Sequence, residues 1–190
     1  MIEPEAYEPD PAFGAQVLKE TDRWTLVLVR QLSHPPEKVW RALTDPAHLR
    51  EWAPFDADGN LGTEGATVKL TTVAAPKPQV SEARISVADA PRRLEYNWGD
   101  HDMRWQLEPS GNGTRLTLWH NIDRQFISMG AAGWHICLDV LARSLDGRPI
   151  GRHVGPDAMK VGWQRLNAEY AAQFGIKPPE YPQAQSKENT

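Results

Sequence analysis

Alternating hydrophobic and polar positions over residues 93–122 predict three consecutive β-strands. Large apolar side chains fall on one face of each strand, and charged or amide side chains fall on the other. The positions on the apolar face are Leu94, Tyr96 and Trp98, then Met103, Trp105 and Leu107, then Leu116, Leu118, His120 and Ile122. Because short connections separate these strands, the pattern predicts an antiparallel meander with one face turned toward a core.

Further segments are predicted as strands of the same sheet. Segments rich in leucine and β-branched residues flank Thr21–Arg23 and predict a hairpin. Residues 66–73 and 81–89 predict two more strands, again with connections of hairpin length. The whole sheet is therefore expected to be antiparallel.

The orientation of Arg30 is left open by the pattern. In the predicted strand 24–32, Arg30 shares a face with Leu26, Leu28 and Leu32, while Val27 and Val29 take the other face. An inward Arg30 would favour an anionic ligand head group. An Arg30 on the outer face or at the end of the strand would have no such role.

Two short helices are predicted between the hairpin and the rest of the sheet. Prolines at positions 35 and 36 begin the first helix, where a missing amide donor costs little. The pair Asp45-Pro46 ends it and begins the second helix. The two helices present Trp40 and Trp52 to one side.

Two amphipathic helices are predicted after the meander. The first covers residues 133–147 and ends at Gly147, and its stripe consists of Trp134, Cys137, Leu138, Leu141 and Leu145. The second covers residues 157–174 with Asp157 as its N-cap, and its stripe consists of Met159, Trp163, Leu166, Tyr170 and Phe174. The first helix needs a broad apolar partner, which the sheet offers.

Length and composition indicate a single α+β domain. The chain has 190 residues, enough for one sizeable core. Residues 1–12 and 177–190 are rich in proline and polar residues without periodicity, so we expect a flexible acidic arm and a flexible tail. The domain itself is expected over residues 13–176.

The charge pattern argues against several classes of partner. The net charge is -4, and acidic and basic residues are mixed along the chain, so neither nucleic acid nor membrane insertion is expected. The acidic, proline-rich start does not resemble a signal peptide, which favours a cytoplasmic protein. The single cysteine excludes an internal disulfide and a cysteine-clustered metal site.

Four linked motifs resemble a known domain family. They are PPEKVWRALTDPAHLREW at 35–52, APRRLEYNWGD at 90–100, SGNGTRLTLWHN at 110–121 and AAGWHICLDVLARSLDG at 131–147. In this order they resemble the domain named after the C-terminal part of the activator of the heat-shock-protein-90 ATPase, over roughly residues 24–147. That domain is a branch of the START/birch-pollen-allergen-like superfamily, also called SRPBCC.

The resemblance implies a helix-grip fold. In this fold a curved antiparallel sheet wraps around a long C-terminal helix, and two short helices follow the first strands. The extra helix predicted at 157–174 resembles only a bacterial-type subset of the family. The co-chaperone itself carries a separate N-terminal domain that does much of the chaperone binding, and we expect none in these 190 residues. Members of the superfamily tend to hold an apolar cavity, but the fold alone does not give a function.

His120 is the candidate polar residue on the inner face. It is expected beside Leu116 and Leu118, where a neutral imidazole serves as a hydrogen-bonded core residue, a ligand anchor or a general base. The last role requires a carboxylate or a nucleophile close by, and the nameable neighbours on this face are apolar. The sequence leaves these three roles open.

The eight tryptophans fill a core, line a cavity, or do both. Trp40 and Trp163 belong to helical packing stripes, whereas Trp98, Trp105 and Trp134 are expected where the sheet faces the long helix. Trp52 and Phe55 would form the entrance. The predicted ligand-binding residues are therefore Trp98, Met103, Trp105, Leu118, His120, Trp134, Leu138, Leu141, Trp52 and Phe55.

Other groups with reactive side chains have simpler interpretations. Turn chemistry explains Gly99–Asp102, so no metal is expected there, and no cofactor motif occurs. His135 and Asp139 are predicted as an exposed pair on the polar side of the long helix. Cys137 is predicted as a small packing residue.

The sequence favours a non-enzymatic carrier or sensor of a small hydrophobic or aromatic molecule. Two alternatives stay open, namely an enzyme of the cyclase or hydrolase type that uses His120, and a chaperone-binding module that uses the outer face of the sheet, with residues such as Arg93 and Arg104. The helix at 157–174 would also suit a homodimer.

Overall fold

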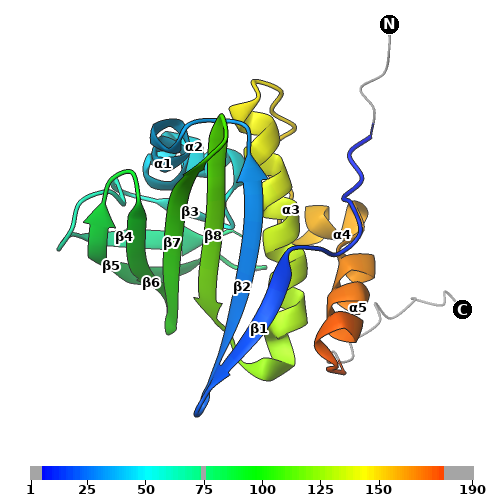
Figure 1. Cartoon of the computed structure of the whole chain (residues 1–190). Coiled ribbons are helices and arrows are strands. Elements are labelled where there is room, and N and C mark those ends of the chain that lie inside the picture. The colour runs from blue at the N-terminus through cyan, green and yellow to red at the C-terminus, as the bar shows by residue number, and fades with distance from the viewer. Residues whose placement is uncertain (1–5, 74–75, 178–190) are drawn as a thin grey trace, which may run out of the picture.

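The sheet of the computed structural model, which describes residues 6–73 and 76–177, contains eight antiparallel strands (Figure 1). Their spatial order is β1-β2-β8-β7-β6-β5-β4-β3. The strands are β1 (Ala15–Glu20), β2 (Arg23–Leu32), β3 (Phe55–Ala57), β4 (Thr67–Thr72), β5 (Gln79–Asp89), β6 (Arg93–Trp98), β7 (His101–Ser110) and β8 (Gly113–Asn121). Residues 1–5 of the predicted arm and 178–190 of the predicted tail lie outside the described ranges.

The helices pack on one face and at one end of the sheet. Figure 1 shows α3 along one face of the sheet, α5 beside α3, and α1 and α2 together near one end of the sheet. The helices are α1 (Pro36–Thr44), α2 (Pro46–Trp52), the 3-10 turn η1 (Arg124–Phe126), α3 (Ile127–Leu145), α4 (Pro156–Lys160) and α5 (Trp163–Phe174). The predicted α+β architecture, with short helices after the first hairpin and a helix added at the C-terminal end, is confirmed.

Pairing between β2 and β8 joins the N-terminal hairpin to the end of the meander. His120 on β8 lies opposite Leu26 on β2 and Met103 on β7. Every residue predicted on the inner face of β6, β7 and β8 is buried, except Trp98, which is partly exposed. The alternation therefore gives the correct register and the correct inward face.

Aromatic rings fill the middle of the space between sheet and helix. Trp105 of β7 contacts Trp52 of α2 edge to face, with ring centroids 6.1 Å apart, and Trp134 of α3 at 5.5 Å. Both Trp52 and Trp105 are almost fully buried. Burial of side chains of this size stabilises a fold by a few kcal/mol each, on the order of 25 cal/mol per Å² of apolar surface.

The two long helices differ from their predicted bounds. Helix α3 begins at Ile127, six residues before the predicted start at 133, because small residues carry little periodic signal there. The predicted helix 157–174 is two helices, α4 and α5, and the break lies at Gly162, whose φ of 100° no helix accommodates. Asp157 is not the N-cap; that position belongs to Gly155.

Residues 6–12, predicted as part of a loose arm, run along α3 and α5. The hydroxyl of Tyr7 donates a 2.7 Å hydrogen bond to Asp139 Oδ2, and the amide of Ala12 donates one of 2.8 Å to Glu169 Oε2. These contacts join the N-terminal segment to helices more than 130 residues away. Burial, then the nearby Asp139 carboxylate, raises the pKa of Tyr7.

The prediction that His135 is exposed is wrong. Its side chain is fully buried, Nδ1 lies 2.8 Å from the hydroxyl of Tyr170, and Nε2 lies 3.5 Å from Asp139 Oδ2. The N-terminal segment contributes Phe13, whose ring meets the imidazole edge to face at 5.3 Å. The polar side of α3 is thus covered by α5 and by residues that precede the first strand.

Arg30 is buried and points to the helix side of the sheet. Its guanidinium lies 4.0 Å from the centre of the Phe13 ring and donates a 3.1 Å hydrogen bond to the carbonyl of Phe13. A longer bond of 3.5 Å reaches the hydroxyl of Tyr170. Arg30 therefore holds the N-terminal segment against the sheet and α5.

Candidate functional site

A cavity of about 780 Å³ lies at one end of the space between the sheet and α3. The sheet contributes Trp98 and His120, and α3 contributes Gly130, Gly133, Trp134 and Cys137. The segment after α3 supplies the opposite wall with His153, Val154, Gly155, Pro156, Ala158 and Met159. Trp163 of α5, with Pro54 and Pro76, completes the lining.

The cavity is apolar and uncharged. Among the described residues, its lining contains three tryptophans and two histidines but no Asp, Glu, Lys or Arg. Cys137 is buried there, and burial raises the pKa of its thiol to about 12. A thiol in that state is a poor nucleophile and a poor metal ligand at neutral pH.

Two hydrogen bonds define the state of His120. Trp134 Nε1, which can only donate, lies 2.9 Å from His120 Nδ1, so Nδ1 is the acceptor. The hydrogen of the neutral ring is therefore on Nε2, which lies 3.3 Å from Nδ1 of His101. The ring also stacks on Trp98 with centroids 5.9 Å apart.

His120 is a weak base in this environment. Burial, and then the neighbouring His101, lowers the pKa of His120 to about 3. Efficient general bases have pKa values near the operating pH. A neutral, doubly hydrogen-bonded imidazole suits a structural or ligand-contacting role better than proton transfer.

The wall opposite the sheet is held in place from both sides. The guanidinium of Arg152 donates two hydrogen bonds to the carbonyl of Arg50, of 2.9 and 2.6 Å, and pairs with Asp56 at 2.6 Å. The ring of the next residue, His153, meets Tyr7 edge to face at 5.6 Å. The loop after α3 is thereby fixed to α2 and β3 on one side and to the N-terminal segment on the other.

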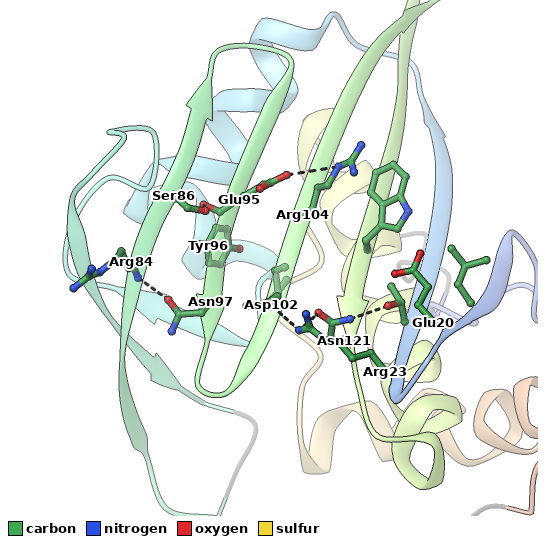
Figure 2. A pocket seen from close by; sticks show the side chains of 14 residues that line it. Glu20, Arg23, Arg84, Ser86, Glu95, Tyr96, Asn97, Asp102, Arg104 and Asn121 are labelled. Atoms are coloured by element: carbon green, nitrogen blue, oxygen red, sulfur yellow. Dashed lines mark hydrogen bonds and ion pairs between the residues drawn. The ribbon is translucent and has the colours of Figure 1, made fainter.

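A second concave surface of about 610 Å³ lies on the outer face of the sheet (Figure 2). It contains three arginines and three acidic residues, which are Arg23, Arg84, Arg104, Glu20, Glu95 and Asp102. Arg23 donates hydrogen bonds of 2.5 Å to Asp102 Oδ2 and of 2.8 Å to Asn121 Oδ1, and Figure 2 shows the three side chains together. The Arg104 guanidinium stacks over Trp119 at 4.3 Å. This groove is polar and balanced in charge.

Comparison with protein families identifies the domain. The family model described as activator of Hsp90 ATPase homolog 1-like protein matches residues 33–146, which is more than half of the chain. The chain belongs to this family. No protein with a curated description matches it.

Solved structures of similar fold confirm the helix-grip architecture of this family member. CalU16 from Micromonospora echinospora has a TM-score of 0.61 and 22% identity, covering 86% of this chain and 96% of that chain. A conserved protein of unknown function from Enterococcus faecalis has a TM-score of 0.61 and 17% identity, covering 84% and 89%. A protein from Chromobacterium violaceum has a TM-score of 0.56 and 25% identity, covering 66% and 98%.

Three of the ten predicted ligand-binding residues line the cavity of this family member, namely Trp98, His120 and Trp134. The other seven are buried and are not among its lining residues; they are Met103, Trp105, Leu118, Leu138, Leu141, Trp52 and Phe55. Trp52 and Phe55, predicted at the entrance, pack deep in the core, where the indole of Trp52 donates a 3.0 Å hydrogen bond to the carbonyl of Ala42.

Sequence reasoning missed the wall formed after α3. The sequence predicts only a packing role for Cys137, Met159 and Trp163, yet all three line the cavity, and it assigns no role to His153, Val154, Gly155, Pro156 and Ala158. The available signal was the loop RPIGRHVGP, whose glycines and prolines indicate a connection but do not show what the connection covers.

No metal site or membrane span is found in the described part of the chain. Over residues 6–73 and 76–177, no three His, Cys, Asp or Glu side chains gather closely enough to hold a metal ion. In the turn 99–102, Asp102 pairs with Arg23 and His101 contacts His120. None of the described helices has an apolar stretch long enough to cross a membrane.

Proposed function

We propose that the protein binds a small, uncharged aromatic molecule in the cavity beside α3 and acts as a carrier or sensor. The observation that carries this proposal is the lining itself, in which Trp98, Trp134 and Trp163 surround a volume of about 780 Å³ without a charged side chain. Such volumes are typical of small-molecule sites, and an uncharged lining disfavours ionic ligands. Aromatic rings gain from edge and offset contacts with indoles beyond the area they bury.

The state of His120 favours binding over turnover. With a pKa lowered to about 3 and both nitrogens in hydrogen bonds, the imidazole is a poor proton acceptor at neutral pH. An enzyme of the cyclase or hydrolase type would need another base. We therefore propose that the ligand leaves the protein chemically unchanged.

The test measures the binding of N-phenyl-1-naphthylamine, an uncharged fluorescent probe. It compares two single variants, each of which replaces one tryptophan by phenylalanine. Trp98→Phe alters the cavity, whereas Trp119→Phe alters the outer groove. We expect saturable binding that Trp98→Phe weakens about two- to tenfold, the equivalent of roughly 0.5–1.5 kcal/mol, and that Trp119→Phe leaves unchanged.

Three outcomes would contradict the proposal. The first is that no neutral aromatic probe binds saturably. The second is that only Trp119→Phe loses binding. The third is that the bound molecule is chemically converted. The second result would move the site to the outer groove, and mass spectrometry of the recovered probe detects the third. The chaperone-binding alternative stays a prediction, and its surface would be the polar groove of Figure 2.

A further inference from the structure

Within the described ranges of the chain, some polar side-chain atoms of the cavity already have hydrogen-bond partners within the protein, and others do not. The indole nitrogen of Trp98 donates to Thr72 Oγ1 at 3.0 Å, and that of Trp134 donates to His120. His120 in turn donates to His101. These groups already have partners within the protein, so a ligand gains nothing from them without breaking a bond.

His153 differs from these groups in the hydrogen-bond partners of its ring nitrogens. Its Nδ1 lies 2.8 Å from the carbonyl oxygen of Gly151, which can only accept, so Nδ1 carries a hydrogen. In the neutral ring, Nε2 is then an acceptor, and no hydrogen bond to it occurs among the residues that the structure describes. The imidazole is also held in position, because Tyr7 contacts its ring and the neighbouring Arg152 is bound to Arg50 and Asp56.

We propose that His153 determines which ligands the cavity accepts, and that Nε2 receives a hydrogen bond from a hydroxyl or N–H group of the aromatic ligand. This inference rests on the proposed function. A hydroxyl that enters an apolar cavity loses its bonds to water and needs a new partner, which His153 supplies. Hydroxylated, uncharged aromatic molecules of the phenol class are therefore the preferred ligands, ahead of ethers of the same ring.

The experiment compares 2-naphthol with 2-methoxynaphthalene, which cannot donate, at pH 8, where neutral imidazoles are favoured. Wild type should bind the naphthol about five- to tenfold more tightly. In His153→Leu the ratio of the two affinities should fall to about one, because the naphthol loses its hydrogen-bond acceptor and the ether has none to lose. His153→Gln, which keeps an acceptor oxygen, should restore part of the preference.

A spectroscopic measurement on wild type gives an independent readout. The ¹⁵N resonance of His153 Nε2 should shift when 2-naphthol binds and should stay in place when the ether binds. If His153→Leu does not fold, this measurement on wild type tests the role of His153 in its place. A ratio near one in wild type, or a preference that survives in His153→Leu, would refute the role of His153 while leaving cavity binding intact. Failure of both probes to bind would instead overturn the proposed function.

Discussion

Trp134 on α3 donates its indole hydrogen to His120 on β8 over 2.9 Å, and this contact ties the long helix to the sheet. The same bond dictates the tautomer of His120, while burial, and then His101, lowers its pKa and keeps the ring neutral. His120 is thus part of the structure that shapes the cavity.

The stability of the protein should fall in mild acid because of His120. Its pKa is about 3 in the folded protein, lowered by burial and then by His101, against 6.5 for a free imidazole. Between these values the unfolded chain binds a proton that the folded protein rejects, so the unfolding free energy decreases as the pH falls. The slope is at most about 1.4 kcal/mol per pH unit. Urea titrations at pH 6.5, 5.5 and 4.5 measure it.

His120→Phe is the control variant, which tests whether His120 causes this pH dependence of stability. At pH 7 it should cost about 1–3 kcal/mol, because the indole nitrogen of Trp134 loses its acceptor. Between pH 6.5 and 4.5, however, its stability should fall less steeply than that of wild type. Equal slopes in the two proteins would show that His120 is not the titrating group.

Core and cavity tryptophans should respond differently to truncation. Trp105 is almost fully buried and its indole nitrogen donates a 3.2 Å hydrogen bond to the hydroxyl of Tyr96, so Trp105→Ala should cost about 3–5 kcal/mol. Trp98 is partly exposed and lines the cavity, so Trp98→Ala should cost less than about 2 kcal/mol and mainly weaken probe binding. Chemical denaturation and probe titration of both variants check this. A larger stability loss for Trp98→Ala than for Trp105→Ala would mean that Trp98, and not Trp105, is the core tryptophan.

Strand periodicity made most of the fold predictable. Alternation placed Leu94, Trp105 and Leu118 on the inner face, and all three are buried. These positions are dictated by neighbours in the sequence and by the pleat of the strand, which are local properties. The linked motifs then indicated a curved antiparallel sheet wrapped around a long helix, but the pairing of β2 with β8 is known only from the structure.

The candidate site was less predictable because distant segments form it. His135 looks polar and exposed on its own helix, but Tyr170 and Phe13, from opposite ends of the chain, cover it. His153 lies in a loop without periodicity, and only the fold places it against the cavity. Gly162 breaks the helical stripe through its positive φ, which a hydrophobic pattern does not reveal.

Tyr7 and Asp139 should stabilise the fold cooperatively. Their 2.7 Å hydrogen bond has an acidic acceptor and is partly buried, so the coupling should be about 1–3 kcal/mol. A double-mutant cycle of Tyr7→Phe and Asp139→Asn, followed by urea unfolding of the four proteins, measures it. Hydrogen exchange in residues 7–13 should also accelerate in Tyr7→Phe. A coupling within experimental error of zero would mean that the N-terminal segment is held by its other contacts alone.

Two glycines of α3 should respond oppositely to alanine. At Gly133 an added Cβ meets no atom of the described residues closer than the indole nitrogen of Trp163, at 3.9 Å. At Gly130 it collides with the end of the Ile122 side chain. Alanine is favoured over glycine inside a helix by up to about 1 kcal/mol. Gly133→Ala should therefore raise the melting temperature by roughly 2–4 °C, while the displacement of Ile122 offsets the gain in Gly130→Ala. Calorimetry of both variants checks this, and equal melting temperatures would mean that Ile122 moves aside without cost.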